Sequence, residues 1–176
     1  MLDQKAAMDI AEEHLRKLSE RSGMNLCLIE SPVLQGDWGW VFGYSTTEHL
    51  RTKSINSAPG GNAPLLVDKT TGAVTTLGTA FPIEHYVERH IEFGDPHAVP
   101  SGKVELLGHK SELIRPPEII KKIRSDCGIG LGEASWIFQE CIAGRPQTLE
   151  MENADLAQAL VRDLGFLGIL AKRLPA

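Results

Sequence analysis

Closely spaced strand-like segments between residues 25 and 78 limit the folds open to this chain. The segments are NLCLIESPVL (25–34), GWVFGYS (39–45), PLLVD (64–68) and AVTTLG (73–78). Their connections are generally too short for the helical crossovers that parallel strands require. The spacing therefore predicts an antiparallel sheet.

Helical periodicity flanks this sheet on both sides. One apolar face is spaced for a helix and comprises Ala7, Ile10, Ala11, His14 and Leu18. Asp3 is placed to cap this helix, Gly23 to end it, and Glu13 to pair with Lys17 four residues on. A second, short helix is indicated by Ile83, Tyr86, Val87 and His90, with Pro82 at its first turn. The order helix, strands, helix predicts an α+β domain over residues 1–93.

The segment GDPHAVPSG, residues 94–102, is rich in Pro and Gly and is predicted to be a linker. The predicted elements beyond it are a strand KVELLG, helices PPEIIKKIRSD and GEASWIFQECIA, a strand RPQTLEM, a helix ADLAQALVRDL and a strand FLGILAKR. Gly144 and Gly165 are expected just past helix ends. Residues 103–176 thus form a predicted second domain of order βααβαβ.

Composition narrows the functional classes. The 176 residues carry a formal net charge of −5, with −4 in residues 1–94 (8 Lys/Arg against 12 Asp/Glu) and −1 in the rest. An acidic chain disfavours nucleic-acid binding and suits a basic protein partner. No apolar run is long enough to span a membrane, and the first residues lack a signal-peptide pattern, so we expect a cytoplasmic protein. Cys27, Cys127 and Cys141 form no CxxC pair and are expected to be buried thiols.

No catalytic motif stands out in the sequence. It contains no GxxxxGK phosphate loop, no HExxH pair, no GxSxG elbow and no Cys/His cluster at zinc spacing. His85 and His90 lie five residues apart on a predicted helix and therefore on different faces. We expect a protein without enzymatic activity, metal or cofactor.

The segment DWGWVFGY, residues 37–44, is the most aromatic part of the chain. Strand alternation places Trp38, Trp40, Phe42 and Tyr44 on one face, which is expected to pack under the first helix. Trp and Tyr also dominate protein-binding hot spots. The contacts expected with a partner come from Asp37, Trp38, Tyr44 and Glu48.

The glycines of GGNAPLLVDKTTGAVTTLGTA, residues 60–80, raise the alternative of a phosphate-binding loop. Such a loop needs a following helix whose N-terminus faces the anion, and here Pro64 and a strand follow instead. The pattern favours a β-hairpin bounded by turns. Its expected structural turn residues are Gly61, Asn62, Asp68 and Gly72.

The ordered motifs of residues 1–93 resemble the immunity protein 35 family of bacterial polymorphic toxin systems. The matching positions are Trp40, Phe42, Tyr44, Gly61, Asn62, Pro64, Val67, Asp68, Thr71, Gly72, Gly78, Thr79, Ala80 and Tyr86. The resemblance implies a small α+β domain that protects its producer by binding a toxin, and it implies no catalytic residues. An immunity protein that neutralises a cognate toxin is therefore the expected function.

Residues 103–173 are similar to the C-terminal domain of the ribosomal large-subunit stalk protein, through IIKKIRSDCGIGLGEASWIF and the element order. The similarity implies a domain that docks translational GTPases through Ile120, Lys121 and Arg124. Pro116, Pro117, Gly132 and Ser135 depart from the family pattern and reduce its basic face. A translation-associated adaptor is thus the alternative function.

Overall fold

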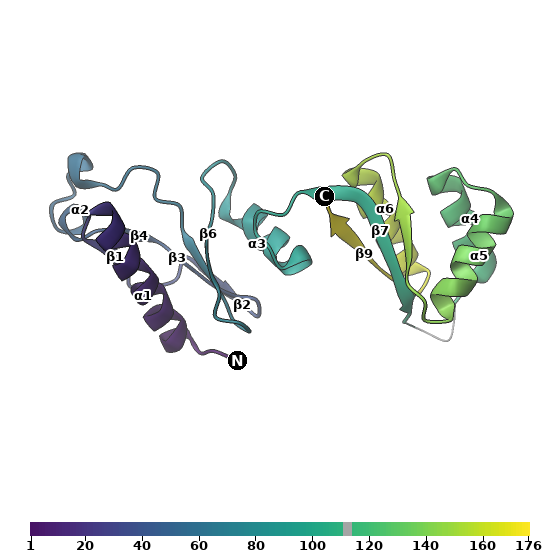
Figure 1. The fold of residues 1–176 in the computed structure, drawn as a ribbon, viewed down its shortest axis with the longest axis horizontal. Helices are drawn as coiled ribbons and strands as arrows, with labels where there is room; N and C mark the ends of the chain where they lie inside the picture. Colours follow the sequence, from purple (N-terminus) through teal and green to yellow (C-terminus); the bar gives the residue numbers. More distant parts are fainter. Residues whose placement is uncertain (111–113) are drawn as a thin grey trace. The chain divides into compact units, whose positions relative to one another are not determined.

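A computed structural model of the chain describes residues 1–110 and 114–176. It divides into two compact units, Met1–His97 and Ala98–Ala176. Each unit combines helices with antiparallel strands (Figure 1). The predicted α+β class is confirmed.

The first unit begins with helix α1, Gln4–Ser22. As predicted, the Asp3 carboxylate accepts a hydrogen bond from the Ala6 N–H at 2.8 Å, and Gly23 ends the helix at φ 71°. The predicted pair also forms, with Lys17 Nζ 3.2 Å from Glu13 Oε1. The helix is tethered at its start because the Leu2 N–H donates to the Lys69 carbonyl at 3.1 Å.

Two antiparallel sheets pack beneath α1. Their strands are β1 Leu26–Leu28, β2 Leu34–Gly36, β3 Gly39–Phe42, β4 Tyr44–Thr46, β5 Leu65–Asp68 and β6 Val74–Thr76. One sheet has the order β2-β3-β5-β6, and β1 pairs with β4 in the other. The two continuous strands predicted over 25–34 and 39–45 are wrong, because each breaks into two strands that belong to different sheets. The breaks fall at residues 29–33 and at Gly43, where the Ile29 N–H donates to the Gly43 carbonyl.

Short helical elements complete the first unit. Helix α2, Thr47–Thr52, and the single 3₁₀ turn η1, Ile55–Ser57, were not predicted. Helix α3, Ile83–Phe93, forms as predicted, although Pro82 caps it rather than occupying its first turn. Gly94 then ends α3 at φ 75°.

Strand β3 lies at the centre of the first unit, with every residue buried. Trp40 and Phe42 pack with Ala7 and Ala11 of α1. Val41 faces the other way and packs with the α3 cluster. A strand covered on both faces contributes to two apolar layers. Each large apolar side chain buried in this way adds about 1.5–3 kcal/mol to the stability of the fold.

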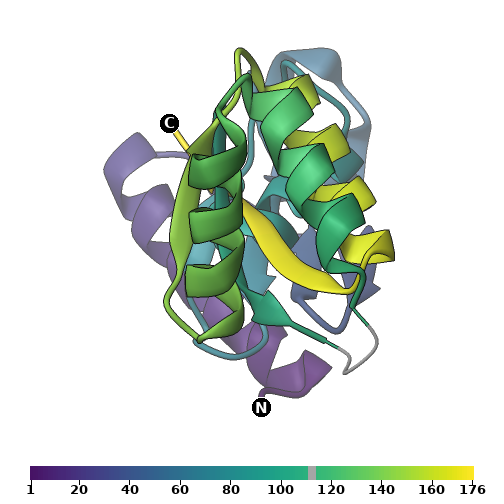
Figure 2. The same cartoon turned by 90° about the vertical axis from the view of Figure 1, so that its right-hand side faces the viewer.

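The second unit is a three-stranded sheet with helices on one face. Its elements are β7 Pro100–His109, α4 Pro116–Cys127, α5 Leu131–Ile142, β8 Gln147–Glu150, α6 Ala154–Phe166 and β9 Ile169–Pro175. The strand order is β8-β7-β9, and Figure 2 looks onto the three helices in front of the strands. The element order βααβαβ is the predicted one. The linker predicted at 94–102 is shorter in the structure, because β7 already begins at Pro100 and pairs there with Pro175.

The core of this unit joins the inward side chains of β7 and β8 to all three helices. On α5, the side chains of Ala134, Ile137, Phe138 and Cys141 are all buried. On α6, Ala157 is buried, whereas Leu156 is 43% exposed. The expected position of Gly165 just past the helix end is wrong. Gly165 lies inside the helix, and Gly168 instead takes the positive φ of 89°.

Candidate interaction surface

The β2–β3 hairpin tip carries the first two predicted contact residues. Asp37 is fully exposed there, and its carboxylate lies 3.7 Å from Lys69 Nζ. The same ammonium sits 5.5 Å from the centre of the Trp40 ring. Gln4, Gln35 and Gly36 line the open hollow around these groups. Asp37 is therefore accessible, but its charge is balanced by a neighbour.

Trp38 lies on the opposite side of the sheet from Trp40 and Phe42, so the predicted four-aromatic face is wrong. Gly39 takes φ 148°, and a Cβ there would lie 2.1 Å from the Val67 carbonyl oxygen, so the chain turns at a residue that only glycine suits. The half-buried Trp38 indole packs over Gly36 and against the cluster that contains Val41. It offers a partner only part of its surface.

Tyr44 is 8% exposed and packs with Leu15, Leu26 and Leu65. Burial raises the pKa of its phenol. This position does not support the predicted contact between Tyr44 and a partner, because little of the side chain reaches solvent. Its backbone carbonyl instead accepts a hydrogen bond from Asn62 Nδ2 at 2.6 Å, which ties the Gly61–Asn62 turn to β4.

Asp68 organises the β5–β6 hairpin. Its Oδ1 accepts hydrogen bonds from the Thr70 N–H at 2.9 Å, the Thr71 N–H at 2.6 Å and the Thr71 hydroxyl at 2.8 Å. Gly72 follows at φ 72°, as expected for the end of this turn. Partial burial acts to raise the pKa of Asp68, but the bonds from Thr71 and Thr70 outweigh it, so the pKa lies below its ordinary value.

The other oxygen of Asp68 faces helix α3. His90 Nε2 lies 3.0 Å from Asp68 Oδ2, and the imidazole is 9% exposed. Among the described residues, nothing hydrogen-bonds His90 Nδ1, which is buried. The pair joins α3 to the hairpin, so we assign Asp68 and His90 a structural role.

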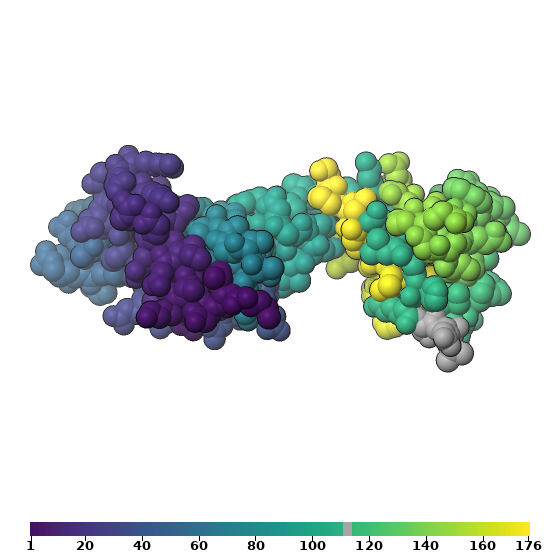
Figure 3. All heavy atoms as spheres, turned by 60° about the horizontal axis from the view of Figure 1, so that its bottom comes forward, coloured from purple at the N-terminus to yellow at the C-terminus, as the bar shows by residue number. Residues whose placement is uncertain are grey.

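Two grooves lie along the end of α1. The first, which we call the edge groove, has a volume of 300 Å³ and lies between α1 and strand β1. It is lined by Glu12, Leu15, Arg16, Ser19, Asn25, Leu26, Cys27 and Leu28. The second, the end groove, has a volume of 570 Å³ and shares Asn25 with the first. The predicted contact residue Glu48 lines it together with Arg51, Met24 and residues of η1. Figure 3 shows the exposed face of α1 in purple.

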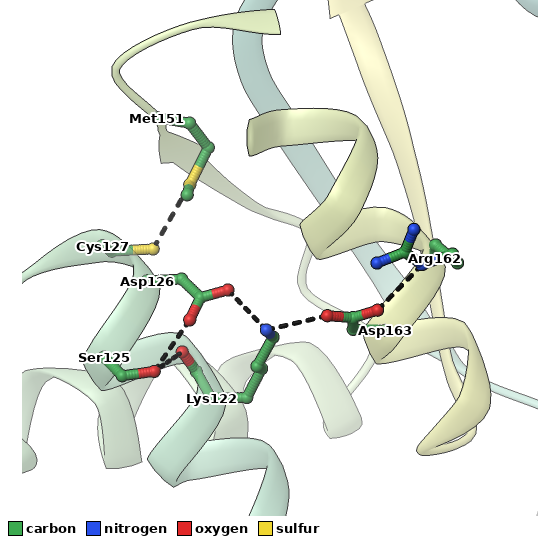
Figure 4. Close-up of polar contacts among 7 residues, drawn as sticks. All are labelled: Lys122, Ser125, Asp126, Cys127, Met151, Arg162 and Asp163. Atoms are coloured by element: carbon green, nitrogen blue, oxygen red, sulfur yellow. Dashed lines mark hydrogen bonds and ion pairs between the residues drawn. The ribbon is translucent and has the colours of Figure 1, made fainter. Parts of the chain in front are cut away.

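The predicted contact residues of the second unit lie on α4. Lys121 and Arg124 are exposed, and neither forms an ion pair with a described residue, whereas Ile120 is half-buried against the core. Lys122 between them points inward (Figure 4). Its Nζ lies 2.8 Å from both Asp126 Oδ2 and Asp163 Oδ2, which connects α4 to α6. The hydrogen bonds to Asp126 and Asp163 raise the pKa of Lys122. Its charge is thus used within the unit.

The described residues contain no group of three or more His, Cys, Asp or Glu side chains placed to hold a metal ion. Burial raises the pKa of the Cys127 and Cys141 thiols. Cys127 Sγ contacts Met151 Sδ at 3.7 Å (Figure 4). None of the helices within residues 1–110 and 114–176 is long and apolar enough to cross a membrane.

Sequence reasoning missed the surface next to β1. Ile29 and Val33 are 45% and 54% exposed, and both lie against Gly43. Glu12 and Leu28 line the edge groove. The prediction of one continuous strand over 25–34 gave no reason to expect this surface. No local sequence signal shows which edge of a strand will stay unpaired.

Comparisons with known proteins relate the chain to a bacterial protein and to a protein family. The uncharacterized protein YrhB of Escherichia coli (strain K12) is 40% identical over 50 residues, which are 28% of this chain and 53% of that protein. The chain thus spans about half the length of this relative. No solved structure matches the chain. The family model for immunity protein 35 matches residues 5–89, so the first unit is similar to that family over most of its length.

Proposed function

We propose that this protein is an immunity protein whose first unit binds a cognate bacterial toxin and blocks it by contact, without catalysis. The observation that carries the proposal is the match of residues 5–89 to the immunity protein 35 family. Inhibition by contact needs an accessible surface rather than a reactive group. The exposed grooves beside α1 and the formal charge of −4 on residues 1–94 suit that role.

The toxin encoded by the adjacent gene is the partner to test. Cells expressing that toxin should survive when the full chain is co-expressed, and the two purified proteins should form a complex on size exclusion. A destabilised variant that is still expressed, such as Phe42→Asp, serves as the negative control because Phe42 is fully buried. If the full chain neither protected the cells nor formed a complex with the toxin, the proposal would be wrong.

A second candidate function concerns the second unit alone. Lys121 and Arg124 are exposed and form no ion pair with a described residue, and we infer from them that this unit could dock a translational GTPase, as the stalk resemblance implies. The basic surface is small, because Lys122 is occupied by Asp126 and Asp163. This candidate therefore ranks below toxin binding.

The double variant Lys121→Glu/Arg124→Glu tests it in a pull-down of purified elongation GTPases. Binding to the unchanged protein should be lost in the variant. Lys103→Glu, which reverses a charge on the open face of the sheet, is the matched control and should bind as before. Equal binding of all three proteins would contradict this function.

A further inference from the structure

Strand β1 has one unpaired edge. It pairs only with β4 among the described strands. The Ile29 N–H donates to the Gly43 carbonyl at 2.9 Å, and the Thr47 N–H donates to the Asn25 carbonyl at 3.0 Å. In an antiparallel ladder, such bonded positions alternate with positions whose backbone groups point away from the partner strand. The N–H and C=O groups of Leu26 and Leu28 therefore point away from β4.

Helix α1 satisfies only one of these four groups. The Leu26 N–H donates to Ser19 Oγ at 3.1 Å. No described residue pairs with the Leu28 N–H or with the carbonyls of Leu26 and Leu28. An unpaired donor between two unpaired acceptors is the pattern that an added strand recognises.

The space beside this edge is already open. The edge groove of 300 Å³ is lined by residues 25–28, and it shares the lining residue Asn25 with the end groove of 570 Å³. A strand advances about 3.3 Å per residue, so a few extended residues could lie along β1 and continue past Asn25 towards Met24 and Glu48. The two grooves therefore suit an extended segment better than a compact ligand.

Charge indicates what kind of segment fits. Arg16 lines the edge groove, but its guanidinium already binds Glu13 and Glu20. Glu12 also lines the groove and forms no ion pair with a described residue. The groove thus has an available carboxylate in a domain of negative net charge, which complements a basic segment.

We propose that the free edge of β1 binds an extended, basic segment of the toxin, which adds to the β1–β4 sheet as a third strand. This inference rests on the proposed function, because it assigns the toxin's contact to the edge groove. Backbone hydrogen bonds to Leu26 and Leu28 hold the segment, and Glu12 faces a Lys or Arg side chain in it.

Amide hydrogen exchange of the full chain, free and saturated with the toxin from the adjacent gene, tests the proposal. In the free protein the Leu28 amide should exchange fast, while the Cys27 and Ile29 amides, which face β4, exchange slowly. Binding should slow the Leu28 amide by at least about tenfold. An unchanged Leu28 amide in a formed complex overturns the docking site and leaves the proposed function standing.

Two variants with matched controls measure affinity. Leu28→Pro removes the outward N–H and should weaken binding at least about tenfold, whereas Thr76→Pro removes an outward N–H on strand β6 and should not. Glu12→Lys should weaken binding about tenfold, whereas Asp9→Lys, on the same helix outside the groove, should have little effect. If Leu28→Pro fails to fold, Glu12→Lys still tests the proposal, because Glu12 is exposed and its substitution should not disturb folding. Equal affinities for Glu12→Lys and Asp9→Lys overturn the charged part of the proposal.

The remaining outcomes are also distinct. If the free chain is a dimer in solution and its Leu28 amide is already slow, a second copy occupies the edge and the proposal is wrong. If the toxin does not bind the full chain at all, the proposed function fails and this inference fails with it.

Discussion

Asp68 shows how one side chain can hold both a turn and a helix. One oxygen accepts three hydrogen bonds within the hairpin, and the other faces His90 of α3. The motif Val-Asp-x-x-Thr-Gly is therefore explained by structure, because Thr71 and Gly72 complete the same turn. The residues of this motif need no ligand to account for them.

The lowered pKa of Asp68 makes its contribution depend on pH. A carboxyl whose folded pKa lies below its unfolded value of 3.8 stabilises the fold above that value, and the contribution is lost as pH falls through the folded pKa. Thr71→Val removes one donor and should reduce the free energy of unfolding by about 1 kcal/mol at pH 7. Urea unfolding at pH 7 and at pH 3 measures this, and the difference from the unchanged protein should shrink at pH 3. A difference that stays constant would show that Asp68 ionisation is not involved.

Gly78 makes a second residue-scale prediction. A Cβ at this position would lie 2.1 Å from the Tyr86 hydroxyl oxygen, so the ring of Tyr86 occupies the space that a side chain needs. Gly78→Ala should reduce the free energy of unfolding by about 1–3 kcal/mol, because Tyr86 is buried and must shift. Gly60→Ala is the control, since its Cβ would meet open space. Equal urea midpoints for the two variants would contradict this packing.

At the scale of elements, partly exposed charged side chains join α4 to α6 in the second unit. Lys122 of α4 bridges Asp126 on its own helix and Asp163 on α6 (Figure 4). Arg162 also contacts Asp163 at 3.0 Å. Neighbouring residues of one helix thus have opposite roles, with Lys121 and Arg124 directed to solvent and Lys122 directed to α6.

Removing the Lys122 ammonium should loosen the contact between α4 and α6. Lys122→Met leaves the carboxylates of Asp126 and Asp163 near each other without the ammonium that bridges them, so it should lower the thermal midpoint of the protein. Lys121→Met is the control, because it makes the same substitution on the exposed face of α4. It should leave the thermal midpoint nearly unchanged. High salt should narrow the gap between the two variants, because it screens the repulsion. Identical midpoints would show that the bridge contributes nothing to stability.

For the whole molecule, the first unit contains everything that the proposed immunity function uses. Its core clusters draw on α1, the two sheets and α3. The family match ends at residue 89, before His90 and before His97, whose Nε2 lies 2.8 Å from the Thr76 carbonyl oxygen. The structural unit therefore needs a few residues beyond the match.

Two truncations test this boundary. Residues 1–97 should fold cooperatively and protect cells from the toxin as the full chain does. Residues 1–89 should unfold at a clearly lower temperature, because they lose His90 and its contact with Asp68. Circular dichroism melts and the co-expression assay measure both. Loss of protection by a folded 1–97 fragment would place part of the toxin contact in the second unit.

The sequence by itself determined the α+β class, the capping of α1, the hairpin turn at Asp68 and the element order of the second unit. Each depends on residues close together in the chain, such as Asp3 with Ala6 or Asp68 with Thr71, so local rules suffice. Only the tertiary structure decided the strand breaks at residues 29–33 and Gly43 and the burial of Tyr44. It also decided that Trp38 lies on the opposite side of the sheet from Trp40. These depend on which strands pair across long separations, since the Gly43 carbonyl is taken by Ile29 and Gly39 lies against Val67. The same pairing leaves Leu28 at a free edge, so the proposed toxin site could be seen only in the folded chain.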